Sequence, residues 1–139
     1  MQPSPHQKSL RILVIDDNAD AAMTLAALLG LWGHEVRAVT SGMEGIEMSR
    51  IFRPELVLLD FEMPRMHGGT VAEVLRQMPA LVQTAIIAVS GTSADDYRLD
   101  RYRDLFDDFV SKPYNLRRLE EIVAAVASGC RPLHIQHSR

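Results

Sequence analysis

Acidic, hydroxyl and basic residues stand at the ends of short apolar runs in this sequence. Asp16 and Asp17 end the first run, Asp60 ends a later one, and Ser90 and Lys112 follow the last two. Three carboxylates that share a small site repel one another, which raises the pKa of one of them unless a cation lies among them. Because the ligands are all oxygens, they favour a hard ion such as Mg²⁺, which also keeps waters and phosphate oxygens.

This set of side chains could support the attack of a carboxylate on phosphorus. Carboxylates form aspartyl-phosphate intermediates, while Lys112 offers a point charge for an anion and Ser90 a hydroxyl donor. Such transfer relies on positioning and charge neutralisation. A single residue such as Asp17 or Asn18 would be interpreted as a helix cap, but four complementary strand ends favour a Mg²⁺-assisted phosphoacceptor at Asp60.

The elements that position these residues alternate along the chain. Short apolar segments rich in β-branched residues and leucine predict strands, and segments with helical spacing separate them. The predicted strands are 11–15, 34–39, 55–59, 84–89 and 106–110. The predicted helices are 19–31, 43–51, 69–77, 94–104 and 116–127. Gly33, Pro54, Pro79 and Gly129 mark helix ends.

Strands that alternate with helices of this length need crossover connections, so we expect a mostly parallel sheet with helices on both faces. The near-continuous apolar run 56–59 agrees with burial on both faces. In open parallel sheets, ligands collect at the carboxyl ends of the strands. The residues that could do chemistry are therefore expected at one edge of a single α/β domain.

The composition limits the classes of function that this chain can have. The chain has 139 residues, of which 47% are hydrophobic and 24% charged, which fits one soluble domain. A net charge of −3 without a run of Lys and Arg argues against direct binding of nucleic acid. The single cysteine, Cys130, excludes an internal disulfide, and no signal peptide or membrane span is predicted. We expect a cytoplasmic protein with tails at 1–9 and 128–139 around a domain at 10–127.

Four motifs, in this order and spacing, resemble the receiver domain of bacterial response regulators over about residues 11–127. They are ILVIDD at 12–17, LLDFEMPRMHG at 58–68, Ser90-Gly91 and Lys112-Pro113. The resemblance implies a flavodoxin-like (βα)5 fold with a five-stranded parallel sheet in the order 2-1-3-4-5. It also implies a signalling phosphoacceptor of two-component systems that catalyses only its own phosphorylation and dephosphorylation.

The resemblance assigns a role to each matching residue. Asp60 is the expected phosphoacceptor, and Mg²⁺ is expected to bind Asp17 and Asp60 directly and Asp16 through water, with the backbone carbonyl of Glu62 as a further ligand. The remaining expectations concern the phosphoryl group and the switch: Ser90, Gly91 and Lys112 for phosphoryl binding, Phe109 as the switch aromatic, and a cis peptide bond before Pro113.

The resemblance also implies partners. A sensor histidine kinase or a histidine phosphotransfer protein would supply the phosphoryl group. A downstream protein would bind the face formed by the fourth helix, the fifth strand and the fifth helix, where Tyr97, Tyr102 and Tyr114 are expected. A homodimer is also compatible with the resemblance. Both a single-domain regulator similar to chemotaxis regulators and a receiver of a hybrid kinase fit the sequence.

Three residues depart from the family pattern. Glu62 places an acid beside the metal edge, where it could slow attack by anionic donors or tune hydrolysis. His67 stands where Asp or Asn, which are better helix caps, are frequent, and it is expected to be an exposed loop residue. Leu105 stands where a Gly commonly ends the fourth helix.

Two other functions use similar residues. A phosphatase similar to haloacid dehalogenases would also need Asp, Lys, a hydroxyl and Mg²⁺, but its motif has a second Asp where Glu62 stands, and no cap domain fits in the chain. A receiver-like module that binds partners without phosphorylation usually loses an acid or the lysine, and this sequence keeps them all.

Overall fold

The computed structural model describes residues 8–91 and 97–129 of the chain. The first seven residues of the expected N-terminal tail, nearly all of the expected C-terminal tail with Cys130, and residues 94–96 of the fourth expected helix lie outside the described residues. Strands and helices alternate along the described chain, as the sequence predicts. No helix within it has both the length and the apolar character needed to cross a lipid bilayer.

The strands are β1 (Arg11–Ile15), β2 (Glu35–Val39), β3 (Leu56–Asp60), β4 (Ala85–Ser90) and β5 (Asp108–Ser111). The α-helices are α1 (Ala19–Leu31), α2 (Gly42–Phe52), α3 (Gly68–Arg76) and α4 (Leu116–Ala127), and two 3₁₀-helices are η1 (Pro79–Leu81) and η2 (Tyr97–Leu105). All four strand pairs are parallel, and the order is β2-β1-β3-β4-β5. The predicted flavodoxin-like sheet order is therefore confirmed.

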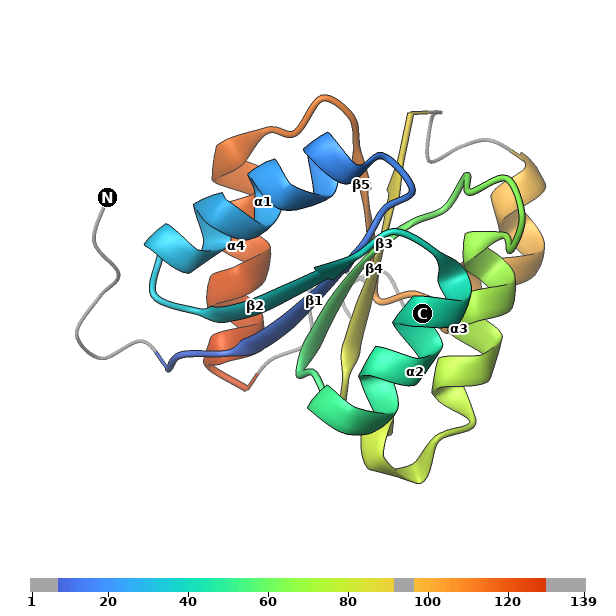
Figure 1. The fold of residues 1–139 in the computed structure, drawn as a ribbon, viewed down its shortest axis with the longest axis horizontal. Coiled ribbons are helices and arrows are strands. Elements are labelled where there is room, and N and C mark those ends of the chain that lie inside the picture. Colours follow the sequence, from blue (N-terminus) through green and yellow to red (C-terminus); the bar gives the residue numbers. More distant parts are fainter. Residues whose placement is uncertain (1–7, 92–96, 130–139) are drawn as a thin grey trace.

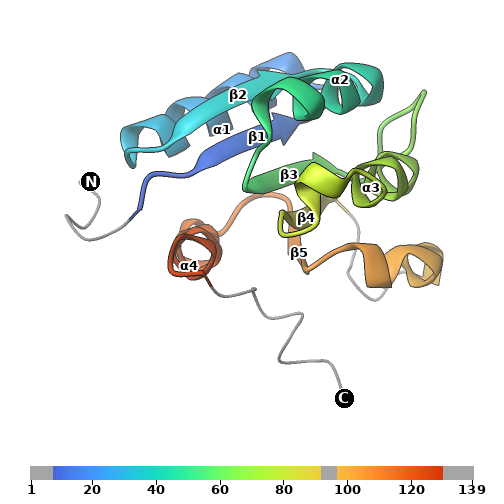
Figure 2. The same cartoon turned by 90° about the horizontal axis from the view of Figure 1, so that it is seen from below.

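The molecule has three layers, with α1 and α4 on one face of the sheet and α2, α3 and η2 on the other (Figure 1, Figure 2). Each face has its own hydrophobic core. Leu25 and Leu29 of α1 pack with Ile122 of α4 on one face, whereas Val71 of α3 and Phe106 lie in the core of the other. Because β3 and β4 contribute side chains to both cores, every residue of these two strands is buried.

Polar caps start three of the helices where the sequence changes from loop to helix. The side chains of Asn18, Ser41 and Asn115 accept hydrogen bonds from the backbone N–H of Ala21, Glu44 and Arg118. After α1, Gly33 adopts a φ of 98°, a left-handed conformation that suits glycine. Asn18 is thus the cap of α1, which leaves Asp17 free of that role.

The fourth crossover corrects two sequence predictions. The described part of the predicted helix 94–104 is the 3₁₀-helix η2. Its residues Tyr102 and Leu105 pack against the core and lie three residues apart, which matches the 3₁₀ period. Strand β5 begins at Asp108 rather than Phe106. The Phe106 ring is buried because it packs in the core from the turn before the strand.

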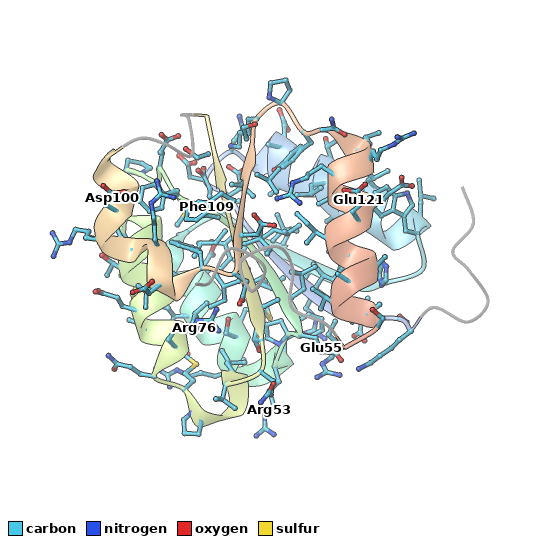
Figure 3. The ribbon with its side chains drawn as sticks, turned by 180° about the vertical axis from the view of Figure 1, so that it is seen from behind. Arg53, Glu55, Arg76, Asp100, Phe109 and Glu121 are labelled. Carbon is cyan, nitrogen blue, oxygen red and sulfur yellow. The ribbon has the colours of Figure 1, made fainter. Side chains whose placement is uncertain are left out.

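A group of ion pairs lies at the amino-terminal edge of the sheet. Glu55 pairs with Lys8 and Arg11, and the Nε of Arg11 donates to the Arg53 carbonyl at 3.0 Å. Burial acts to raise the pKa of Glu55, but the hydrogen bond and charge of Lys8 together with Arg11 lower it overall. Figure 3 shows Arg53 and Glu55 near one end of the sheet, far from Phe109.

Candidate functional site

The sheet register brings the predicted functional residues to its carboxyl edge. Ile15 lies beside Leu59, so that Asp16 follows next to Asp60. On the other side of β3, Asp60 lies beside Val89. Ser90 is paired with Ser111, which places Lys112 one residue beyond this pair. Residues separated by up to 96 positions in the sequence therefore meet at one edge.

Three carboxylates converge at this edge. Asp16, Asp17 and Asp60 each offer one oxygen, and these three oxygens lie within 4.8 Å of one another. In an octahedral Mg²⁺ site with the usual bond length, adjacent ligand oxygens lie about 3.0 Å apart and opposite ones about 4.2 Å apart. The oxygens of the three aspartates lie close to this range. The donor set, which contains only oxygens, thus fits Mg²⁺.

Lys112 supplies a positive charge to the same edge. Its Nζ lies 3.2 Å from Oδ2 of Asp16 and 3.7 Å from Oδ2 of Asp60. Burial acts to lower the pKa of Lys112, but the hydrogen bond to Asp16 and the charges of Asp60 and Asp16 raise it overall. The ammonium is therefore held in its charged form between two carboxylates. The Lys112–Pro113 peptide bond is cis.

Asp60 lies at the centre of the cluster and is 5% exposed. Its Oδ1 accepts a hydrogen bond from the Glu62 N–H at 3.0 Å. Burial, helped by the charge of Asp16 and against the effects of the Glu62 N–H and Lys112, raises the pKa of Asp60 from 3.8 to about 7. Because burial disfavours the ionised form of Asp60, any cation that binds beside it stabilises its carboxylate.

Gly91 and Glu62 are joined across the mouth of the site. The Gly91 N–H donates to Oε1 of Glu62 at 3.1 Å, and both residues are exposed. Ser90, by contrast, is buried, and its carbonyl accepts from the Lys112 N–H at 2.9 Å. We predicted from the sequence that Glu62 lies near the metal edge, but not that it bonds to the Ser90-Gly91 segment.

Phe109 lies half-buried on β5, next to η2. Its ring centroid is 5.5 Å from that of Phe106, and the guanidinium carbon of Arg103 lies 5.4 Å from its centroid. The ring therefore has an aromatic neighbour in the core and a cation outside. Its role as a switch stays a prediction.

His67 caps α3 instead of standing free in a loop. Its Nδ1 accepts from the Gly69 N–H at 3.1 Å, and its ring packs 4.3 Å from Phe61 and 5.2 Å from Tyr102, measured between centroids. The prediction of an exposed histidine is wrong, because the ring lies in an aromatic cluster with Phe61 and Tyr102. Gly69 makes this possible: a Cβ there would lie 2.5 Å from the Tyr102 ring.

We expect His67→Ala to lower the free energy of unfolding by about 2 kcal/mol, since it removes both a cap and an aromatic contact. His67→Asn should recover about half of this loss, because Asn can still cap the helix. Urea unfolding of the three proteins measures both effects. Equal stability of the Ala and Asn variants would show that the cap contributes nothing.

Arg76 ties α3 to the start of β5. Its guanidinium donates to the Leu105 carbonyl at 2.9 Å, to the Thr84 carbonyl at 2.8 Å and to Oδ2 of Asp107 at 2.9 Å. The same Asp107 oxygen accepts from the Ile86 N–H. This network holds the turn in which Leu105 replaces the expected glycine, and no motif in the sequence predicts it.

Tyr114 is a neighbour of the site that sequence reasoning assigned to the output face. It is half-buried and packs against the core beneath α1 and α4. Burial, together with the charges of Asp16 and Asp60, raises the pKa of Tyr114 to about 12. The signal that could have found it was its position two residues after Lys112, which places it at the same edge.

A protein family described as the response regulator receiver domain matches residues 12–124 of the chain. The chain is 31% identical over 122 residues to the cell cycle transcriptional regulator CtrA of Caulobacter vibrioides, which covers 88% of the chain and 51% of CtrA. It is 30% identical to PilH of Pseudomonas aeruginosa, over 86% of the chain and 98% of PilH. A hybrid histidine kinase of Dictyostelium discoideum is 32% identical, but only 8% of that protein is covered.

Solved structures share the fold. A CheY-like receiver domain from Methylobacillus flagellatus is 26% identical with a TM-score of 0.77, over 86% of this chain and 99% of that one. The chemotaxis protein CheY4 of Vibrio cholerae is 19% identical with a TM-score of 0.78, over 86% and 99%. The chain thus spans about half the length of CtrA but nearly the full length of such isolated domains.

Proposed function

Because the chain belongs to the response regulator receiver domain family, we propose that Asp60 accepts a phosphoryl group from a phosphorylated histidine of a partner protein. The observation that carries the proposal is the cluster at the carboxyl edge of the sheet. There, oxygens of Asp16, Asp17 and Asp60 lie within 4.8 Å of one another, with the Lys112 ammonium 3.7 Å from Asp60. A buried carboxylate with these neighbours is suited to nucleophilic attack on phosphorus.

Transfer breaks one bond and makes another. An Asp60 carboxylate oxygen forms a bond to phosphorus while the bond from phosphorus to the donor imidazole nitrogen breaks, and the electron pair of that bond stays on the imidazole. Lys112 offsets the charge of the phosphoryl oxygens, and Ser90 and Gly91 donate hydrogen bonds to them. Asp16, Asp17, Asp60 and the Glu62 carbonyl would hold Mg²⁺, which when bound supplies positive charge to the same oxygens.

The family is a signalling module, and we propose that this chain works as one, catalysing only its own phosphorylation and dephosphorylation. The donor is a sensor histidine kinase or a histidine phosphotransfer protein in the cytoplasm. The output is a protein interaction, or a homodimer, through η2, β5 and α4. In Figure 3, Asp100 on η2 and Glu121 on α4 lie on either side of β5, with Phe109 between them. Phosphorylation would shift a pre-existing equilibrium of this face through Ser90 and Phe109.

Incubation with a small phosphodonor such as phosphoramidate and Mg²⁺ is expected to add one phosphoryl group to the protein. Intact mass spectrometry detects the adduct, and borohydride reduction followed by peptide mapping locates it at Asp60. Removal of Mg²⁺ with EDTA should reduce the initial rate by at least about tenfold, because positive charge on the phosphoryl oxygens lowers the barrier.

Two variants make the test specific. Asp60→Asn removes the nucleophile and is expected to show no adduct. Asp20→Asn, an equal change at an exposed position of α1, should behave like the wild type. Wild-type incorporation in the Asp60→Asn variant, or an adduct mapped to another residue, contradicts the proposal.

A further inference from the structure

The Glu62 side chain occupies a backbone donor at the mouth of the phosphorylation site. Its Oε1 accepts from the Gly91 N–H at 3.1 Å, while its own N–H donates to Oδ1 of Asp60 at 3.0 Å. Glu62 therefore links the acceptor residue to the segment that follows β4. The Glu62 carboxylate thus has a side-chain hydrogen bond with the Gly91 N–H.

A phosphoryl group on Asp60 would compete for that donor. Asp60 is paired with Val89 across β3 and β4, one residue before Ser90. The Ser90 hydroxyl and the Gly91 N–H, which follow Val89, are thus donors on the β4 side of the cluster, and Lys112 lies on the β5 side. The phosphoryl oxygens carry nearly two negative charges. They would accept a hydrogen bond from the Gly91 N–H and would repel the Glu62 carboxylate.

We infer that Glu62 is a positioning residue whose carboxylate fills the phosphoryl-binding N–H of Gly91 in the resting protein and must leave when Asp60 is phosphorylated. The inference rests on the proposed function and adds that the Glu62 carboxylate competes with the phosphoryl group for the Gly91 N–H. Glu62 would lower the affinity of the site for phosphoryl-like anions and hold the Ser90-Gly91 segment in its resting position until it is displaced. A neutral residue at position 62 would leave the donor open.

Two features make a purely structural role for this bond insufficient. Glu62 and Gly91 are both exposed, so neither needs the other to satisfy a buried polar group. The Glu62 carboxylate also follows the acidic cluster in the chain, and its N–H is bonded to Asp60, so its side chain lies where a phosphoryl group on Asp60 would repel it.

Beryllofluoride with Mg²⁺, a mimic of a phosphorylated aspartate, tests the competition without a chemical step. Binding is measured by NMR titration of the wild type, Glu62→Gln and Glu62→Ala. We expect Glu62→Ala to bind the mimic roughly three to ten times more tightly, as the loss of one competing hydrogen bond implies. Glu62→Gln removes the charge but keeps an acceptor, and should fall between the other two.

The Gly91 amide resonance reports the bond itself. In the free proteins it should differ between the wild type and Glu62→Ala, and on saturation with the mimic it should reach the same position in both, because Glu62 has left. Glu121→Gln, which removes one exposed carboxylate from α4 (Figure 3), controls for net charge and should match the wild type.

The outcomes separate the two hypotheses. Equal affinity of the wild type and both Glu62 variants, within about twofold, overturns the competition while leaving phosphorylation intact. A Gly91 resonance unchanged by Glu62→Ala does the same. Failure of the wild type to bind the mimic, or equal binding by Asp60→Asn, instead overturns the proposed function. Matching melting curves for the Glu62 variants and the wild type confirm that the comparison is made on folded protein.

Discussion

Asp60→Asn is expected to be more stable than the wild type at pH 7 when divalent cations are absent. Burial and the charge of Asp16 raise the pKa of Asp60 to about 7 in the folded protein, against 3.8 in the unfolded chain. Between these values the folded state binds more protons than the unfolded state, so the free energy of unfolding falls as pH rises from about 4 to about 7. Asn stays neutral and avoids this loss.

The size of the effect follows from the pKa difference. Three pKa units correspond to about 4 kcal/mol, and solvent at the rim of the site reduces this to roughly 2 kcal/mol. Urea unfolding with EDTA between pH 4 and pH 8 measures it, and the single tryptophan, Trp32, which is buried, provides the fluorescence signal. The two stability curves should meet near pH 4 and separate toward pH 7.

The titration of His34 does not affect the comparison of the two proteins. Burial lowers the pKa of His34, opposed by the charge of Glu55, so His34 makes the folded state more stable as pH rises. Because His34 is present in both proteins, its effect cancels in the difference. Mg²⁺ should stabilise the wild type more than Asp60→Asn, since it favours the ionised carboxylates. Parallel pH curves for the two proteins would contradict the prediction.

Arg76→Met is expected to lower the free energy of unfolding by roughly 3 to 5 kcal/mol. The change removes the Arg76 guanidinium from Asp107, which is 4% exposed, and from the Leu105 and Thr84 carbonyls. A buried carboxylate that loses one of its charged contacts keeps its desolvation penalty. Thermal unfolding should shift downward by roughly 10 °C for a domain of this size.

Arg50→Met is the matched control, because it makes the same change on the exposed side of α2 and should have almost no effect. Asp107→Asn combined with Arg76→Met removes both charges and should recover part of the loss. If Arg76→Met and Arg50→Met unfold together, the network does not stabilise the fold.

The sequence predicted the sheet and the acidic cluster because strong, local signals produce them. Apolar runs such as 56–59 end at charged residues, and a parallel sheet collects those ends at one edge. Asp16, Asp17, Asp60 and Lys112 were therefore placed correctly relative to one another from their strands alone. Gly33 likewise adopts the left-handed conformation that its position after α1 predicts.

What the sequence did not predict depends on pairs of residues far apart in the chain. Phe106 looked like part of a strand because it is apolar, but it packs in the core from a turn that Arg76, thirty residues earlier, holds in place. His67 looked exposed because its cluster requires Tyr102 from η2 and a glycine at position 69. The bond from Gly91 to Glu62 joins two loops, and loop conformations carry no periodic signal.

Different kinds of residues lie at the two edges of the sheet. The carboxyl edge carries the acids, the lysine and the hydroxyl, while the amino-terminal edge carries the ion pairs of Glu55 with Lys8 and Arg11. Substitutions at the amino-terminal edge can change the stability of the fold with little effect on the chemistry at the other end. Over evolutionary time, descendants of this sequence could therefore adapt to a new growth temperature at one edge while the acidic cluster at the other stays unchanged.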